Sequence, residues 1–228
     1  PLELLNKQIE LNFSFGYIIM NSESQKSHFI KNKYYLQLLK KNIVFNYSHG
    51  IADYLKNELQ INTFSYYFFE FMKENQDDVE RDYDYLFIGS PTEFRKKQIA
   101  YLREAFPLKR FYVDFEWNHR SPQSMKEILK KSNWVLNIPY YQDDRNLESH
   151  RIHNALSAGC QVVSFKSGDT NTDEFYNDYI YFSDNLVEFF KSHEIKEKKS
   201  YEHLIRGLSA KWITHNCFII KKIKENNK

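Results

Sequence analysis

A glutamate and an arginine stand three residues apart in this chain, at Glu148 and Arg151, just after a polar loop over residues 140–146. The loop follows a short apolar run, residues 134–138, that is typical of a buried strand. A guanidinium in the first turn of a helix can donate two parallel hydrogen bonds to the oxygens of a phosphate. Arg151 is therefore the best candidate for binding an anionic ligand. The plain alternative is an exposed Glu148–Arg151 ion pair on a helix surface.

The elements around these two residues read as a strand, a helix and a second strand. Pro139 ends the first strand, because proline has no backbone N–H to donate, and residues 160–165 are apolar enough for the next one. Between them, an apolar stripe and a glycine suited to a helix C-cap indicate a helix: Ile152, Ala155, Leu156 and Gly159. Ligands of open α/β sheets bind beyond the carboxyl ends of the strands. The polar loop and the first helical turn are therefore expected at the ligand-binding end.

The rest of the chain alternates strands and helices, which predicts parallel sheets with helices on both faces. Further strands are predicted over residues 15–20, 43–46, 62–69, 85–88, 109–115 and 179–182. Further helices are predicted over residues 31–41, 51–59, 92–105, 121–129, 184–190 and 201–224. A polar run over residues 73–82 predicts a linker between two domains, residues 1–75 and 76–228.

The string NALSAGCQVVS, preceded by SNWVLNI and a charged Glu/Arg turn, resembles the donor-binding region of GT-B glycosyltransferases. In that family an E-A-x-A-x-G-x-P-V segment closes on the nucleotide of a sugar nucleotide. Two positions depart from the pattern, because Asn154 replaces the usual ribose-binding Glu and Gln161 the usual Pro. The strings YIIMNSESQ and YYLQLLKKNIVFNYSHGIADYL also resemble the N-terminal part of compact sugar transferases.

The resemblance implies an α/β fold of two Rossmann-like lobes, GT-B type, with a reduced N-terminal acceptor-side lobe. It implies a group 1-like glycosyltransferase, of hexosyl- or deoxyhexosyltransferase type, that needs no cofactor. The donor would be a nucleoside-diphosphate sugar, with a UDP-sugar favoured, and the acceptor a glycan or another hydroxyl compound.

The expected donor-binding residues follow from the same comparison. Backbone N–H groups or guanidinium groups would bind the diphosphate. Carboxylate or amide oxygens would bind the ribose hydroxyls, and an aromatic ring would stack on the base or the sugar. They are Gly89, Ser90, Arg95, Tyr140, Glu148, Arg151, Asn154 and Asp169. For Gly89 and Ser90 an ordinary turn is an equal alternative, as is packing under the loop for Tyr140 and a plain turn for Asp169.

An acceptor hydroxyl must lose its proton, which an inverting transferase achieves with a carboxylate or a histidine. Glu23 follows the first predicted strand and His49 the second, so both are candidate catalytic bases. Each has the alternative of a solvated loop residue. The missing glutamate at position 154 favours an inverting reaction over a retaining one.

The composition argues against several other kinds of partner and location. The chain has 228 residues and a formal net charge of only +2, which gives no argument for a nucleic-acid partner. It contains no apolar run near the ~20 residues that span a bilayer, so we expect no membrane span and a cytoplasmic location. It begins at Pro1, which suggests one domain of a longer chain. Cys160, at the start of a predicted strand, is expected to be a buried free thiol.

Two rival functions remain open at this point. A GT-A enzyme would hold a metal with an Asp-x-Asp motif after a strand, but Asp82 and Asp84, which have that spacing, precede theirs. A degenerate transferase domain that binds a nucleotide or a partner without turnover is the second rival. Neither zinc nor any other metal is expected, since the eight histidines and two cysteines show no ligand spacing.

Overall fold

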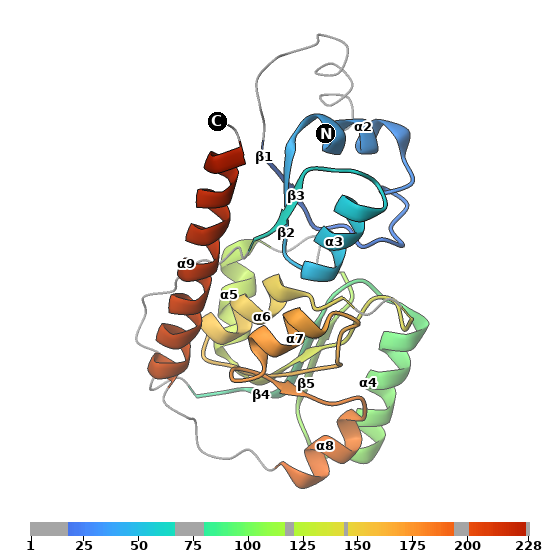
Figure 1. The fold of residues 1–228 in the computed structure, drawn as a ribbon. Coiled ribbons are helices and arrows are strands. Elements are labelled where there is room, and N and C mark those ends of the chain that lie inside the picture. Colours follow the sequence, from blue (N-terminus) through green and yellow to red (C-terminus); the bar gives the residue numbers. More distant parts are fainter. Residues whose placement is uncertain (1–17, 67–79, 117–120, 144–145, 194–200, 227–228) are drawn as a thin grey trace. The chain divides into compact units, whose positions relative to one another are not determined.

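The computed structural model describes residues 18–66, 80–116, 121–143, 146–193 and 201–226 (Figure 1). The chain divides into two compact units, the first made of residues 1–67 with 212–228 and the second of residues 68–211. The division passes through the last helix, α9 (Tyr201–Asn226). The predicted boundary between residues 75 and 76 lies outside the described residues.

The first unit contains a parallel sheet of three strands in the order β1-β2-β3. Its described elements before α9 are β1 (Ile18–Asn21), α2 (Lys33–Lys41), β2 (Ile43–Asn46), α3 (His49–Asn57) and β3 (Thr63–Ser65). Side-chain caps fix where both helices begin, because Asn32 accepts from the N–H groups of Tyr34 and Tyr35, and Ser48 accepts from that of Ile51. These elements agree with the alternation predicted from the sequence.

The second unit contains five parallel strands in the order β5-β4-β6-β7-β8. The strands are β4 (Tyr83–Ile88), β5 (Phe111–Asp114), β6 (Ser132–Asn137), β7 (Gln161–Ser164) and β8 (Tyr181–Phe182). The helices between and after them are α4 (Glu93–Ala105), α5 (Pro122–Lys130), α6 (Ser149–Ser157), α7 (Thr170–Tyr176) and α8 (Leu186–Ser192). The chain moves from β4 to β5 in one direction and then returns past β4 to β6. The strand order therefore reverses between β4 and β6.

The reversal decides which helices cover which face of this sheet. Crossovers between parallel strands are right-handed, so α4 lies on one face while α5, α6 and α7 lie on the other (Figure 1). α8 packs beside α4, and α5 beside α6. The two parallel sheets with their helices confirm the predicted α/β class, of Rossmann-like type.

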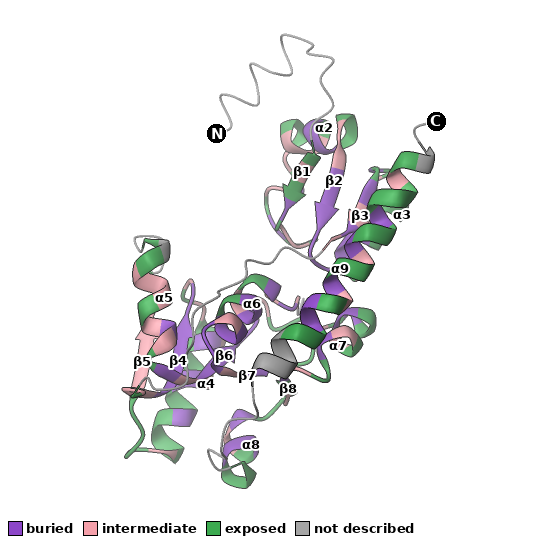
Figure 2. Ribbon diagram, turned by 90° about the vertical axis from the view of Figure 1, so that its left-hand side faces the viewer, coloured by how far each residue is buried: buried purple, intermediate pink, exposed green. Residues whose placement is uncertain are grey.

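The core of the second unit lies along its central strands, and β4, β6 and β7 are buried over most of their lengths (Figure 2). Strands covered on both faces are expected to be almost continuously apolar, as residues 85–88 and 134–138 are. Large aromatic side chains fill this core, among them Tyr85, Phe87, Trp134, Phe189 and Phe190. Cys160 is buried as a free thiol, as predicted.

Several predicted helix ends are confirmed by the cap geometry. Thr92 caps α4 by accepting from the Arg95 N–H, and Ser121 caps α5 with Pro122 at its first position. Gly159, just after α6, has a φ of 72°, the left-handed conformation that glycine adopts without strain. α7 was not predicted, because residues 170–176 carry no apolar stripe. Among the described helices, none is both long and apolar enough to cross a membrane.

Candidate functional site

The carboxyl ends of β4 and β6 are where the strand order of the second sheet reverses, and such a switch point is the usual ligand site of open α/β sheets. Gly89 and Ser90 follow β4, and Ile138, Pro139 and Tyr140 follow β6. The Gly89 N–H donates to the Asp114 carbonyl at 3.0 Å, which continues the pairing of β4 with β5. Gly89 and Ser90 therefore lie at the carboxyl edge of the sheet, as predicted from their positions in the sequence.

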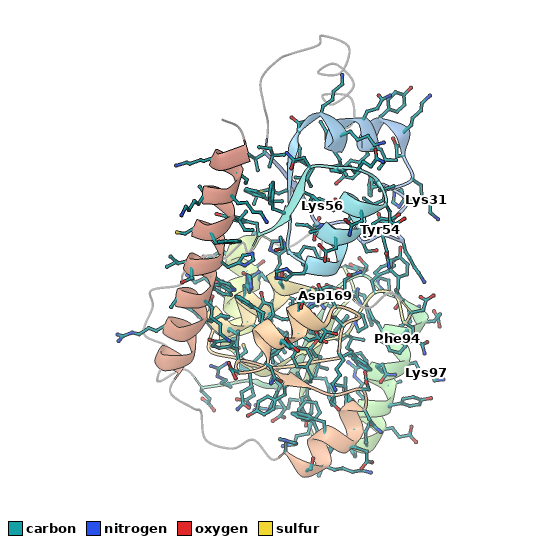
Figure 3. The ribbon with its side chains drawn as sticks, in the orientation of Figure 1. Lys31, Tyr54, Lys56, Phe94, Lys97 and Asp169 are labelled. Carbon is teal, nitrogen blue, oxygen red and sulfur yellow. The ribbon has the colours of Figure 1, made fainter. Side chains whose placement is uncertain are left out.

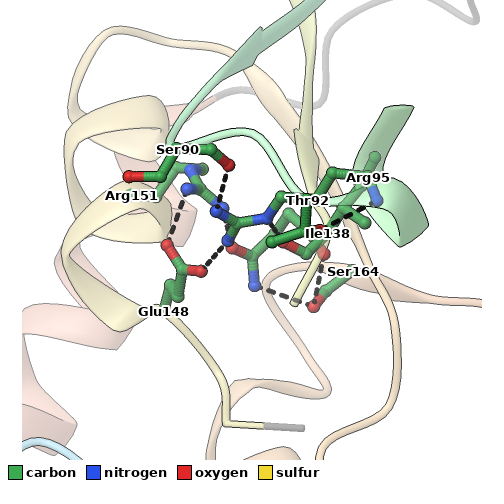
Figure 4. Close-up of polar contacts among 8 residues, drawn as sticks. Ser90, Thr92, Arg95, Ile138, Glu148, Arg151 and Ser164 are labelled. Atoms are coloured by element: carbon green, nitrogen blue, oxygen red, sulfur yellow. Dashed lines mark hydrogen bonds and ion pairs between the residues drawn. The ribbon is translucent and has the colours of Figure 1, made fainter. Parts of the chain in front are cut away.

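Arg95, in the first turn of α4, extends its side chain into this edge (Figure 4). Only 2% of the residue is exposed. Its Nε donates to the Ile138 carbonyl at 3.0 Å, its Nη1 to the Ser90 carbonyl at 3.0 Å, and its Nη2 to the Glu148 carboxylate. One guanidinium thus joins the ends of two neighbouring strands to the start of α6.

Burial lowers the pKa of the Arg95 guanidinium, and the positive charge of Arg151 acts in the same direction. The Glu148 carboxylate opposes both effects and raises this pKa. An arginine side chain stays protonated in proteins, so the group keeps its charge. A buried charge is tolerated only when it is paired and hydrogen-bonded. The three hydrogen bonds of Arg95 meet that requirement.

Glu148 bridges the two arginines. One oxygen of its carboxylate contacts Nη2 of Arg95, and the other lies 2.6 Å from Nη2 of Arg151 (Figure 4). The ion pair within the turn, expected as the plain alternative for Arg151, is therefore present, but it is part of a larger cluster. Two positive groups and one negative group leave this cluster with one net positive charge.

The last residues of two neighbouring strands hold Arg151 in position, one directly and the other through its neighbour. Its Nη1 donates to Oδ1 of Asn137 at 2.9 Å, and Nδ2 of Asn137 donates to the Ser164 hydroxyl at 2.9 Å. Asn137 and Ser164 are the last residues of β6 and β7 and are almost fully buried. Sequence reasoning did not select them. The available signal was a polar residue closing an apolar strand at each position.

Gly89 provides the space into which both guanidinium groups extend. A Cβ atom added at Gly89 would lie 2.8 Å from Nη2 of Arg151 and 3.2 Å from Nη1 of Arg95. Both guanidinium groups also lie near the ring of Phe87, whose centroid is 5.4 Å from Cζ of Arg95 and 5.3 Å from Cζ of Arg151. The absent side chain at position 89 is therefore what allows the two arginines to converge.

Gly89→Ala should lower the free energy of unfolding by about 1–3 kcal/mol, the usual cost of inserting a methyl group into a filled space. Arg151 cannot move aside freely, because Glu148 and Asn137 hold its guanidinium. Gly207→Ala, in α9, is the matched control: its Cβ would come no closer than 3.4 Å to Tyr179. That variant should gain about 0.5–1 kcal/mol from helix propensity. Urea unfolding of both variants measures the difference, and equal stabilities would contradict the crowding at Gly89.

The N-terminus of α6 points its positive dipole end at the same edge. Glu148 is the N-cap residue, yet its side chain makes no capping hydrogen bond, because its carboxylate is bound by the two arginines. Ser149, the first residue of the helix, is 1% exposed, and its hydroxyl has no hydrogen-bond partner in the part of the chain that the structure describes. A buried hydroxyl of this kind normally has a partner. Both features favour an additional oxygen-rich ligand at this helix end.

Tyr140 is the exposed aromatic residue of the site. The residue is 43% exposed, and Cζ of Arg95 lies 5.3 Å from the centroid of its ring. Its ring also meets that of Tyr141 edge to face, with 4.7 Å between the centroids. An exposed ring held by a cation and a second ring can stack on a planar or apolar group of a ligand.

Two predicted donor-binding residues do not join this cluster through any of its hydrogen bonds. Asn154 lies exposed on α6, three residues after Arg151. Asp169, labelled in Figure 3, caps α7. Its carboxylate accepts from the N–H and the hydroxyl of Thr172. Its neighbour Asp173 accepts hydrogen bonds from Ser167, while burial raises the pKa of its carboxyl. The role of Asp169 that the structure describes is structural.

Glu23 and His49 belong to the first unit. Glu23 follows β1 and accepts a hydrogen bond from the Ser27 hydroxyl at 2.5 Å. His49 is the first residue of α3, and its ring meets that of His215 edge to face, with 5.3 Å between the centroids. Both therefore follow strand ends, as their sequence positions predicted. Their role as catalytic bases stays a prediction.

The Asp-x-Asp spacing lies at the opposite edge of the second sheet, because β4 begins at Tyr83. Asp84 accepts from the Arg110 N–H at 2.8 Å, and Asp82 lies 3.1 Å from Nζ of Lys131. Both carboxylates are thus engaged by protein groups. Throughout the ranges that the structure describes, no three metal-ligating side chains lie close enough to hold an ion.

The chain matches no protein-family model, and no curated protein matches it in sequence. The candidate site therefore rests on its own geometry: two arginines, a bridging carboxylate, an uncapped helix N-terminus and an exposed tyrosine at the switch point of a parallel sheet.

Proposed function

We propose that the second unit binds the diphosphate of a nucleotide sugar at the carboxyl ends of β4 and β6. The convergence of Arg95 and Arg151 on Gly89, beside the N-terminus of α6, carries this proposal. Guanidinium groups and helix N-termini are the groups with which proteins bind phosphates. The net positive charge of the cluster suits an anion, and Tyr140 offers a ring for the base or the sugar.

The reaction we propose is transfer of a sugar from a nucleoside-diphosphate donor, a UDP-sugar in the first instance, to a hydroxyl acceptor such as a glycan. When the bond from the sugar to the diphosphate breaks, negative charge grows on the leaving phosphate. Arg151 would stabilise that charge, and fixed donors of this kind are effective because they need no rearrangement during the reaction. Glu23 or His49 would accept the proton of the acceptor hydroxyl in an inverting reaction within a GT-B architecture.

The residues below the site supply the rigidity that such stabilisation requires. Asn137 is fixed by the sheet and by its hydrogen bond to Ser164, and it holds Nη1 of Arg151 while Glu148 holds Nη2. In this arrangement Glu148 acts as a positioning residue for the arginines. Ribose binding, which the resemblance assigns to this region, would then fall to Asn154, which is exposed on the same helix.

UDP should stabilise the protein against heat and do so equally in EDTA, because the positive charge at the site comes from side chains. At 100 times its Kd a ligand adds about 2.7 kcal/mol to the free energy of unfolding. Thermal-shift measurements with UDP, GDP, TDP and CMP, each with EDTA and with manganese, test both the binding and the choice of base. Stabilisation that disappears in EDTA and returns with manganese would contradict metal-independent binding.

A non-catalytic nucleotide-binding domain is the second candidate, and one observation favours it: Asn154 stands where the resembling family has a ribose-binding glutamate. The two candidates differ in turnover and not in binding. Hydrolysis of a UDP-sugar to UDP, or transfer to an added acceptor, would support the enzyme. Binding of UDP without either reaction would support the second candidate.

A further inference from the structure

The carboxyl edge of the first sheet carries a row of buried polar residues. Asn21, Asn46 and Ser65 are the last residues of β1, β2 and β3, and the strand register pairs them directly. Their exposed fractions are 1%, 0% and 8%. Three neighbouring strands that each end in a buried polar side chain indicate that these side chains form hydrogen bonds at this edge, since burying a polar group without a partner is costly.

The outer two members of this row have their partners within the unit. Asn21 donates from Nδ2 to the Glu23 carbonyl at 3.1 Å, and its Oδ1 accepts from the Tyr35 hydroxyl at 2.6 Å. Nε2 of His215, from α9, lies 3.0 Å from the Ser65 carbonyl and 3.2 Å from the Ser65 hydroxyl. A carbonyl oxygen can only accept, so this histidine carries its proton on Nε2.

Asn46, in the centre of the row, is only half satisfied. Its Oδ1 accepts from the Ser48 N–H at 2.9 Å, whereas its Nδ2 is buried with no hydrogen-bond partner among the described residues. Ser48 is the N-cap residue of α3, a helix of nine residues. The carboxamide is planar, and its oxygen is bonded at the N-cap, so the Nδ2 donor lies at the same turn. The N-terminus of α3 and the unpartnered Nδ2 donor therefore lie at the same turn.

The groups at this turn indicate which kind of ligand it could bind. An unpartnered N–H donor needs an acceptor atom, and the N-terminus of a helix favours a negative charge. The ring of His49, the first residue of α3, lies against that of His215 and adds a second imidazole. His49 is half-buried and Gly50 is exposed, so the turn reaches solvent on that side.

We propose that the β2–α3 turn of the first unit is an oxyanion-binding site that takes a phosphate or carboxylate group, with Asn46 Nδ2 as its central donor. His49 and His215 would line the site. The argument for this site uses residues of the first unit alone and does not depend on nucleotide binding by the second unit. It also assigns a role to His215, which lies 150 residues from Ser65 along the sequence.

The test is an NMR titration of the whole chain, in an Arg151→Ala background that removes the main donor of the second unit. Inorganic phosphate and acetate are added at constant pH and ionic strength, with chloride as the reference anion. We expect a saturable shift of the Asn46 side-chain NH₂ signals and of the His49 and His215 ring signals. A response to phosphate alone would assign the site to phosphate groups, and a response to acetate as well would extend it to carboxylates.

Asn46→Asp is the matched variant, because it keeps an acceptor oxygen for the Ser48 N–H and replaces only the donor. It should weaken anion binding by about tenfold or more, the value of one hydrogen bond to a charged group. If this variant does not fold, the Asn46 signals of the background protein decide alone. Asn46 signals that respond to neither anion, or that show contact only with a long-lived water, would overturn the proposal. Neither result would affect UDP binding by the wild-type protein, which tests the second unit.

Discussion

Replacing Arg151 with alanine should weaken UDP binding by roughly ten- to a hundredfold and leave uridine binding nearly unchanged. The guanidinium lies on the first turn of α6 and is held between Glu148 and Asn137, so it is already oriented when a phosphate arrives. A charge-assisted hydrogen bond of this kind contributes about 1.5–3 kcal/mol. Uridine has no phosphate for Arg151 to contact, so its affinity should not depend on this side chain. Isothermal titration calorimetry with both ligands measures the difference.

Two further variants make this result specific. Arg151→Lys should recover only part of the affinity, because an ammonium lacks the planar fork of the guanidinium. Lys96→Ala removes a positive charge from the exposed surface of α4, where its only described ion pair is with Glu93, and it should bind UDP as the parent does. UDP binding by Arg151→Ala with parental affinity would reduce Arg151 to a partner of Glu148. The donor site would then lose its main residue.

The sequence was sufficient to bring Gly89 and Arg151 to one edge of the sheet, because parallel strands have their carboxyl ends at the same edge. Gly89 and Arg151 are 62 positions apart, yet each follows a recognisable strand and lies at a predictable end of it. The same reasoning placed Glu23 and His49 after β1 and β2. Helix caps could also be predicted from the sequence, since Thr92 and Ser121 accept hydrogen bonds from N–H groups three residues away.

What the sequence could not reveal are the contacts that join distant segments. Glu148 was expected to serve a ribose, but its carboxylate binds Arg95, which lies 53 residues earlier. That contact exists because the return crossover places β6 beside β4, and no local pattern encodes this geometry. Asn137 and Ser164 were missed for a related reason: a polar residue that ends an apolar strand looks like the first residue of a loop. In the structure they are the buried support of Arg151.

The same distant contacts make the stability of the second unit sensitive to the loss of Arg95. Arg95→Ala should lower the free energy of unfolding by about 3–5 kcal/mol, the usual cost of removing one partner from a buried ion pair. The Ile138 and Ser90 carbonyls would each lose a donor, and Glu148 would keep only Arg151. Lys96→Ala, the next residue on the same helix, removes an equal charge from an exposed pair and should change stability by no more than about 0.5 kcal/mol.

Arg95→Lys separates the charge from the hydrogen-bond geometry. Its ammonium retains the charge beside Glu148, but it cannot reach the Ile138 and Ser90 carbonyls and the carboxylate with the spacing of a guanidinium. We therefore expect a loss of stability between those of the parent and of Arg95→Ala, measured as the urea midpoint at unchanged slope. An Arg95→Ala variant as stable as Lys96→Ala would show that Arg95 is not needed to join β4 and β6 to α6. In that case Glu148, Asn137 and Arg151 would have to hold the site without Arg95.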